Sequence, residues 1–150
     1  SHSNHNDSGG VGLVLGMIVN FPHEALPKEL AALAVNLTFA KANCTIMIQN
    51  KAVSKMVERL VSAKNKDPLL LKILRNLSQF TYKMQEEGEI TSNIDYIYRG
   101  LWSPHVKSLI IVLVESDNHE VTIEVSCVLH CIYIYISLYI NDEKINDLYT

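Results

Sequence analysis

LLKILRNLS at residues 70–78 decides the fold of this chain because LAALAVNLT at residues 30–38 has the same pattern. Asn36 and Asn76 lie 40 positions apart, and aliphatic residues recur at matching offsets before them. Both motifs end on a small hydroxyl residue. Self-similarity at such a period is typical of stacked helical repeats, in which one unit cannot bury its apolar face alone. The repeat therefore favours a protein that holds a partner over one that catalyses a reaction.

Three further segments carry apolar residues at the spacing of one helix face, i, i+3, i+4 and i+7. They are Val11, Val14, Leu15 and Ile18; Val53, Met56, Val57 and Leu60; and Val106, Leu109, Ile110 and Leu113. Asp67 followed by Pro68 is typical of a helix start, with Asp as the cap and Pro at the first helical position. We expect the leucine ridges Leu30/Leu33/Leu37 and Leu70/Ile73/Leu77 to pack between repeats.

The ends of the chain differ from the repeat. Residues 1–10 are polar, and we expect a flexible tail there. Residues 11–131 are the expected repeat segment, with an inserted loop at about 82–104 that holds an acidic cluster and the single tryptophan, Trp102. Residues 132–140 alternate like a strand and lead into an end rich in Asn, Asp, Lys and Ile. We expect residues 132–150 to be a divergent or non-native tail.

Composition argues against several classes of function. A net charge of −3 and a pI near 6.0 give no electrostatic basis for binding nucleic acid or an anionic membrane surface. The longest nearly uncharged apolar run, residues 127–140, is shorter than the roughly 18 to 20 residues that a membrane span needs. Three cysteines without a disulfide-scaffold pattern favour a reducing compartment. We expect a cytoplasmic protein with no membrane insertion and no nucleic-acid partner.

Catalytic and metal-binding motifs are weak. The six histidines are scattered, and the Cys127/Cys131 pair has no further ligands at matching spacing. Gly10, Gly12 and Gly16 do not have the spacing of a phosphate-binding loop. The sequence therefore predicts no enzyme, no metal site and no cofactor.

The asparagine-bearing amphipathic helices resemble armadillo repeats. Within that superfamily, KDPLLLKILRNLSQ at residues 66–79 resembles the armadillo region of the kinesin-associated protein family, the accessory non-motor subunits of heterotrimeric kinesin-2. The resemblance covers roughly residues 11–129. It implies an all-α, armadillo-type right-handed helical solenoid fragment of about two full repeats plus partial ones.

The same resemblance implies a function and a location. A member of this family would be a non-catalytic adaptor that binds kinesin-2 motor tails and links them to cargo adaptors in microtubule-based movement and intraflagellar transport. It would be cytoplasmic and associated with the cytoskeleton and the cilium.

The candidate partner-binding residues follow from the armadillo resemblance. In armadillo proteins that bind extended peptides, the repeat asparagine faces a concave groove, which makes Asn36 and Asn76 candidates. Lys72 and Arg75 would lie near the same groove and meet acidic segments of a partner. Each has a structural alternative: the asparagines cap or bridge neighbouring helices through backbone groups, and the basic residues are solvated. Trp102 either anchors an interface or packs the insertion onto the helices.

A scaffold of the catenin or importin type is the alternative function. Importin-like proteins carry a tryptophan one helical turn before the asparagine, and these positions hold Ala32 and Lys72 here. The departure argues against capture of basic localisation peptides.

Overall fold

The chain folds as an all-α stack of helices in a computed structural model that describes the backbone of residues 2–86 and 100–149. Side chains are described for residues 9–84, 100–134 and 137. The α-helices in these ranges are α1 (His2–Val19), α2 (Lys28–Leu37), α3 (Lys41–Gln49), α4 (Ala52–Ser62), α5 (Pro68–Glu86), α6 (Val106–Glu115) and α7 (His119–Tyr149). A 3₁₀ helix, η2 (Ser103–His105), leads directly into α6.

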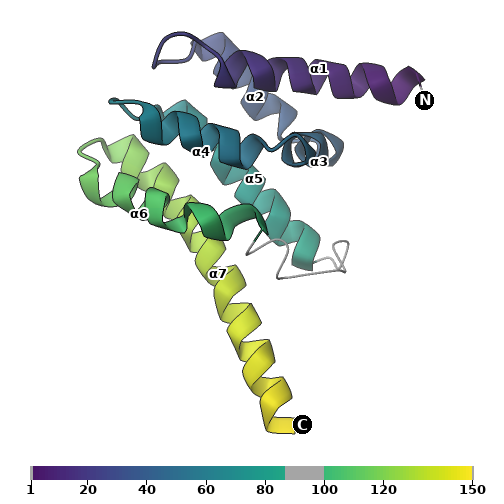
Figure 1. Cartoon of the computed structure of the whole chain (residues 1–150), viewed down its shortest axis with the longest axis vertical. Helices are drawn as coiled ribbons and strands as arrows, with labels where there is room; N and C mark the ends of the chain where they lie inside the picture. Colours follow the sequence, from purple (N-terminus) through teal and green to yellow (C-terminus); the bar gives the residue numbers. More distant parts are fainter. Residues whose placement is uncertain (1, 87–99, 150) are drawn as a thin grey trace.

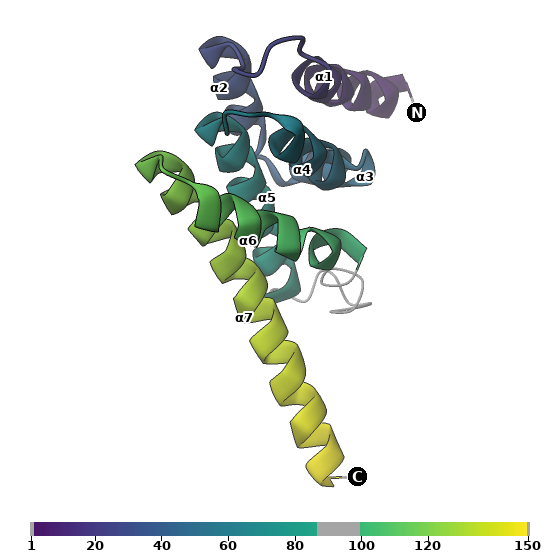
Figure 2. The ribbon, with the colours of Figure 1, turned by 60° about the vertical axis from the view of Figure 1, so that its left-hand side comes forward.

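Two layers of helices run along the molecule (Figures 1 and 2). Helices α1, α4 and α6 form one layer, in which α4 contacts both neighbours. Helices α2, α5 and α7 form the other, in which α5 contacts both neighbours. Helix α3 lies at the edge and contacts α1, α4 and α5. Similar helix pairs thus stack one on another, and this confirms the predicted all-α, solenoid-like fold.

The predicted amphipathic faces form the core between the layers. All four predicted residues of α4 and three of the four in α1 are buried: Val53, Met56, Val57, Leu60, Val11, Leu15 and Ile18. The prediction for α6 was wrong at Ile110, which is 45% exposed. Leu109 and Val112 are the residues that α6 buries, so its inward face is rotated relative to the predicted one.

The two leucine ridges differ in burial. Leu70, Ile73 and Leu77 of α5 are each at most 2% exposed, as expected for residues packed between repeats. In α2 the expectation was wrong for Leu33, which is 46% exposed, whereas Leu30 and Leu37 are partly buried against the core. Helix α2 instead buries Ala31 and Ala34. The reason is that α5 has a layer neighbour on each side, whereas in the described structure α2 has only α5.

Two local features set the course of the chain between helices. Asp67 caps α5, because its Oδ1 accepts a 2.9 Å hydrogen bond from the Leu69 backbone N–H, and Pro68 is the first helical residue as predicted. Lys51 has a left-handed backbone conformation with φ of 61° and joins α3 to α4. Helices α2 and α3 meet at 108°, which directs α3 away from the layer of α2 and α5.

The strand-like alternation of residues 132–140 was a wrong guide to secondary structure, and both ends of the chain belong to helices. Residues 2–10 belong to α1, and residues 132–149 continue α7 without a strand. Extending an existing helix is far easier than nucleating one, and α7 has no Gly or Pro to stop it. The alternating residues also continue a helical stripe, because Val125, Val128 and Ile132 are buried at helical spacing.

Both ends of the expected loop at about 82–104 are helical. Residues 82–86 belong to α5 and Ser103–His105 to η2, while residues 87–99 lie outside the described residues. Trp102 is fully buried, and its Nε1 donates a 3.2 Å hydrogen bond to Thr81 Oγ1 of α5. Of the two alternatives for Trp102, packing of this segment onto the helices is therefore the observed one.

Candidate functional site

A stripe of polar and aromatic residues runs along one face of α5. Asn76, Gln79, Phe80 and Lys83 follow the i, i+3, i+4, i+7 spacing, so they share one face of the helix. Lys72 lies one turn before Asn76 on the same stripe. The stripe therefore begins at the predicted residues and continues toward the end of α5.

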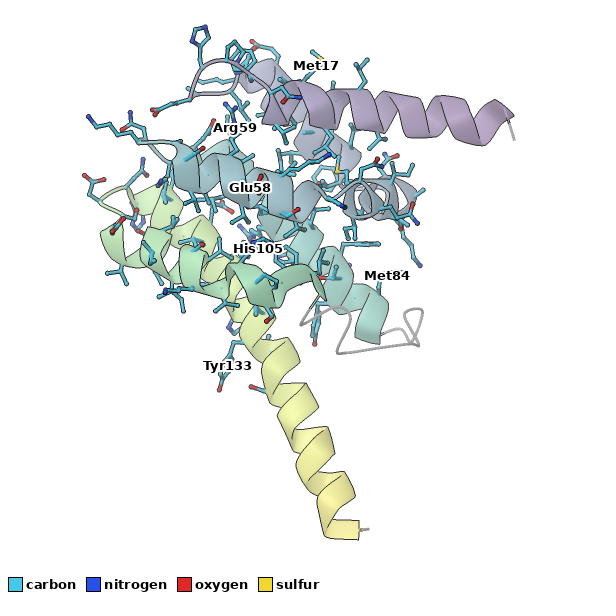
Figure 3. All side chains as sticks on the ribbon, viewed as in Figure 1. Met17, Glu58, Arg59, Met84, His105 and Tyr133 are labelled. Carbon is cyan, nitrogen blue, oxygen red and sulfur yellow. The ribbon has the colours of Figure 1, made fainter. Side chains whose placement is uncertain are left out.

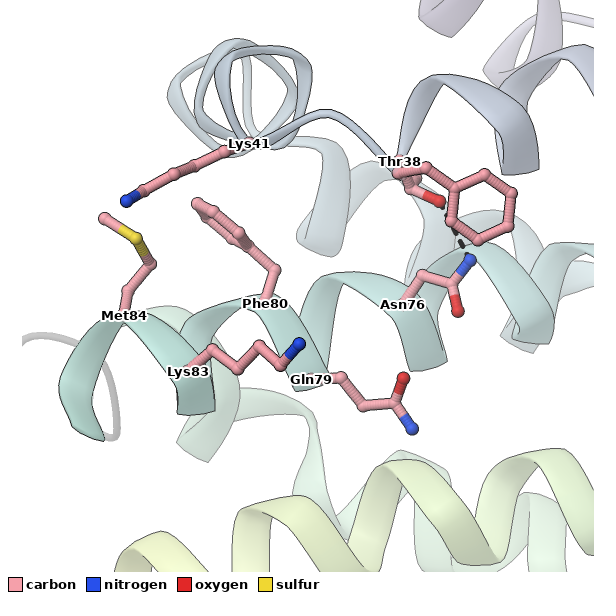
Figure 4. A pocket seen from close by; sticks show the side chains of 8 residues that line it. Thr38, Lys41, Asn76, Gln79, Phe80, Lys83 and Met84 are labelled. Carbon is pink, nitrogen blue, oxygen red and sulfur yellow. Dashed lines mark hydrogen bonds between the residues drawn. The ribbon is translucent and has the colours of Figure 1, made fainter. Parts of the chain in front are cut away.

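The stripe ends in a pocket between α5 and the corner that joins α2 to α3 (Figure 4). Its volume is about 320 Å³. The lining residues are Thr38, Phe39, Lys41, Asn76, Gln79, Phe80, Lys83 and Met84. Two aromatic rings and a thioether thus lie beside two ammonium groups and two amides. Such a mixture can bind an apolar side chain and an anionic group at the same time.

Asn76 is the one predicted residue that lines this pocket. Its Nδ2 donates a 2.8 Å hydrogen bond to Thr38 Oγ1, and the Thr38 hydroxyl donates to the Val35 carbonyl. Asn76 thus bridges α5 to the end of α2, through a side chain rather than the backbone group considered above. Its Oδ1 is a further acceptor on the pocket wall. Asn36 stands at the same place in its motif but is exposed on α2.

Lys72 and Arg75, which were predicted together, have different surroundings in the structure. Arg75 Nη1 lies 3.3 Å from Glu124 Oε2, and the side chain of Glu124 is only 8% exposed. Arg75 therefore meets an acidic residue of α7 in this chain. Lys72 is half-buried and lies one helical turn before Asn76. A partner-binding role for the four predicted residues stays a prediction.

Most of the pocket was missed from sequence. Phe39, Phe80, Lys83 and Met84 were not selected, although Phe80 and Lys83 continue the helical spacing from Asn76. That spacing is the signal that was available. Phe39 and Lys41 carried no such signal, because only the 108° corner between α2 and α3 brings them to α5.

The turn between α1 and α2 is joined to the turn between α4 and α5. Glu24, in the turn after α1, accepts hydrogen bonds from the backbone N–H groups of Lys64 and Asn65, at 2.8 and 3.3 Å. These bonds hold the pKa of the Glu24 carboxyl below its usual value, with the Lys64 bond as the largest cause. Arg59 reaches the same turn and donates to the Phe21 carbonyl at 2.8 Å (Figure 3). The network fixes the two turns to each other.

Other titratable groups lie apart from the pocket. Burial lowers the pKa of His105, and the negative charge of Glu58 opposes this (Figure 3). Burial raises the pKa of the Cys44 thiol to about 11, and its Sγ donates to the Thr38 carbonyl at 3.1 Å. Among the residues that the structure describes, no group of three or more His, Cys, Asp or Glu is placed to hold a metal ion.

Among the residues that the structure describes, no single helix combines the length and apolar character that a membrane span requires, and α2 with α3 meets both only as a pair bent by 108°.

The stacked helix pairs define a helical-repeat protein, and its second layer carries the pocket described above. A profile of the kinesin-associated protein (KAP) family matches residues 3–134. The chain belongs to this family. The match extends into both of the expected tails, from residue 3 at one end to residue 134 at the other. A search of solved structures gave no match.

Proposed function

We propose that the chain is a non-catalytic adaptor, an armadillo segment of the kinesin-2 accessory subunit that binds motor tails and links them to cargo. The family match over residues 3–134 is the observation that carries this proposal. The fold supports it, because a stack of helix pairs presents a long surface to a partner.

The exposed face of the α2, α5 and α7 layer is the proposed contact surface. Asn36, Lys72, Arg75 and Asn76 are its proposed partner-binding residues. Asn76 supports this assignment because its Thr38 hydrogen bond holds the amide in one orientation at the pocket wall. Arg75 would contribute through its exposed part, since the side chain is 36% exposed beside Glu124.

The location follows from the same proposal. An adaptor of kinesin-2 works in the cytoplasm, on the cytoskeleton and in the cilium, where it takes part in intraflagellar transport. Cargo adaptors would be its second class of partner.

Binding to the motor tails is the direct test. The 150-residue chain would be immobilised, and the tail segments of both kinesin-2 motor chains would be passed over it, followed by a basic localisation peptide. We expect the tails to bind and the basic peptide not to bind. Binding of the basic peptide alone would favour the importin-type scaffold, and failure of both tails to bind would overturn the proposal.

A matched pair of variants locates the surface. Asn76→Ala should weaken tail binding, whereas Lys107→Glu, an exposed change on α6, should leave it unchanged. Equal binding by the Asn76→Ala variant and the parent chain would remove the α5 face from the proposed contact surface.

A further inference from the structure

The pocket between α5 and the α2–α3 corner has an apolar base. Phe80 is half-buried against the core, and Phe39 is 76% exposed at the rim. Met84 adds a flexible thioether side chain, of a kind that adapts to different apolar partners. An aromatic ring this exposed at the rim of a pocket is typical of a surface that becomes covered in a complex.

The charge of the pocket is opposite to that of the chain. The chain has a net charge of −3, yet the lining includes Lys41 and Lys83 and no acidic residue. Lys83 has no ion-pair partner among the residues that the structure describes. Figure 4 shows Lys41 of α3 above the row of Phe80, Lys83 and Met84 on α5. The Lys83 ammonium group is therefore placed to attract a carboxylate next to an apolar surface.

We propose that this pocket binds an acidic peptide segment of a protein partner, with an apolar side chain against Phe39, Phe80 and Met84 and a neighbouring carboxylate at Lys83. This inference rests on the proposed adaptor function and specifies the chemistry of the segment that it recognises. Asn76, held by Thr38, forms the wall on the side of α2.

The small number of basic residues in the pocket favours a peptide over a nucleic acid as its ligand. Nucleic-acid binding draws its affinity from many phosphate contacts, and two lysines in an acidic chain supply few of these. A peptide needs only one anionic group beside one apolar anchor, which is the pairing that the pocket offers.

The test uses the 150-residue chain, labelled with ¹⁵N, and three synthetic hexapeptides observed by NMR. The probe is Glu-Glu-Phe-Leu-Glu-Glu, and the matched peptides are Gln-Gln-Phe-Leu-Gln-Gln and Glu-Glu-Ser-Gly-Glu-Glu. We expect the probe to shift the amide signals around Thr38, Phe80 and Lys83. The two matched peptides should each bind about fivefold more weakly, since each lacks one of the two contacts. Equal binding by all three peptides, or shifts confined to other helices, would overturn the proposal.

Two variants separate charge from apolar contact. Lys83→Glu should lower the affinity for the acidic probe about tenfold, because attraction becomes repulsion. The affinity of this variant for the Gln peptide should equal that of the parent. Phe39→Ala should weaken binding of the probe and of the Gln peptide alike. Because the Phe39 ring is exposed, the variant should fold as the parent does. Lys107→Glu on α6 is the charge-matched control and should bind the probe as the parent does.

The kinesin-2 tails distinguish the two proposals. If the tails bind and Lys83→Glu leaves both tail and probe binding unchanged, the pocket assignment fails and the adaptor function stands. If the probe binds in the pocket and neither tail binds, the pocket stands and the kinesin-2 adaptor function fails.

Discussion

Asn76 and Thr38 join two copies of the same motif, because the Asn76 side chain donates a 2.8 Å hydrogen bond to the Thr38 hydroxyl. Thr38 is the hydroxyl residue that ends the first motif, and Asn76 is the asparagine of the second. Residues of the repeated motif itself therefore form the hydrogen bond that connects the two units. Ser78, which corresponds to Thr38, is fully buried and donates to the Arg75 carbonyl at 2.7 Å.

Asn76→Ala should lower the free energy of unfolding by about 1 kcal/mol, because a partly buried hydrogen bond between helices is lost. Urea unfolding followed by circular dichroism measures this. Asn36→Ala is the matched control, since Asn36 has the same place in its motif but is exposed, and it should change the free energy by less than about 0.5 kcal/mol. Equal effects at the two positions would show that the Thr38 bond does not stabilise the stack.

Arg75→Met should destabilise the chain by about 1 to 2 kcal/mol, because it leaves the buried Glu124 side chain without its counter-charge. The effect stays modest because Arg75 is partly exposed in the parent chain, where water screens the pair. Glu124→Gln should cost less, since the remaining guanidinium can turn to water. Urea unfolding of both variants gives the comparison. A larger loss in Glu124→Gln would contradict this account.

Glu24 makes stability depend on acid pH. Its pKa is lowered in the folded chain, so the unfolded chain binds the proton more readily. The contribution is therefore complete above the usual value of 4.5 and is lost as pH falls through the lowered pKa. The melting temperatures of Glu24→Gln and the parent should converge toward low pH. Above pH 4.5 the parent should melt at the higher temperature. Glu115→Gln, at an exposed site on α6, should follow the parent at every pH.

Cys44 should resist alkylation in the folded chain. With a pKa of about 11, about one thiol in a thousand is ionised at pH 8, and the side chain is buried. Cys127 and Cys131 are only half-buried on α7 and should react first with iodoacetamide. Mass spectrometry of peptides from the native and the urea-unfolded chain measures the order. Equal native labelling at all three sites would refute the burial of Cys44.

The outer faces of the stack should cause self-association of the isolated chain. Leu13 of α1 is 67% exposed and Val114 of α6 is 76% exposed. Exposed apolar residues of this kind favour contact between molecules. Sedimentation velocity should show concentration-dependent dimers or larger species, reduced in Leu13→Lys and Val114→Lys but not in Gln49→Lys on α3. A monomer at all concentrations would refute this expectation.

Much of the helical framework was predictable because it depends on local spacing. The apolar residues of α1 and α4 and the Asp67-Pro68 start of α5 act over a few residues, so periodicity and capping chemistry are sufficient. The alternating residues after Cys131 misled because β-propensity is weaker than extension of a helix whose stripe already packs on α5.

The sequence alone determined that this chain is all-α, built on a repeat of about 40 residues and similar to the kinesin-associated proteins, since these depend on local spacing and motif. Only the tertiary structure decided that Asn76 bonds to Thr38, that Arg75 meets Glu124, and that Phe39 joins Phe80 in one pocket. Each of these pairs spans about 40 residues or more and exists only once the helices stack. The physical reason is that side-chain partners between helices are set by the packing of the layers, whereas the helices themselves are set by the spacing within each segment.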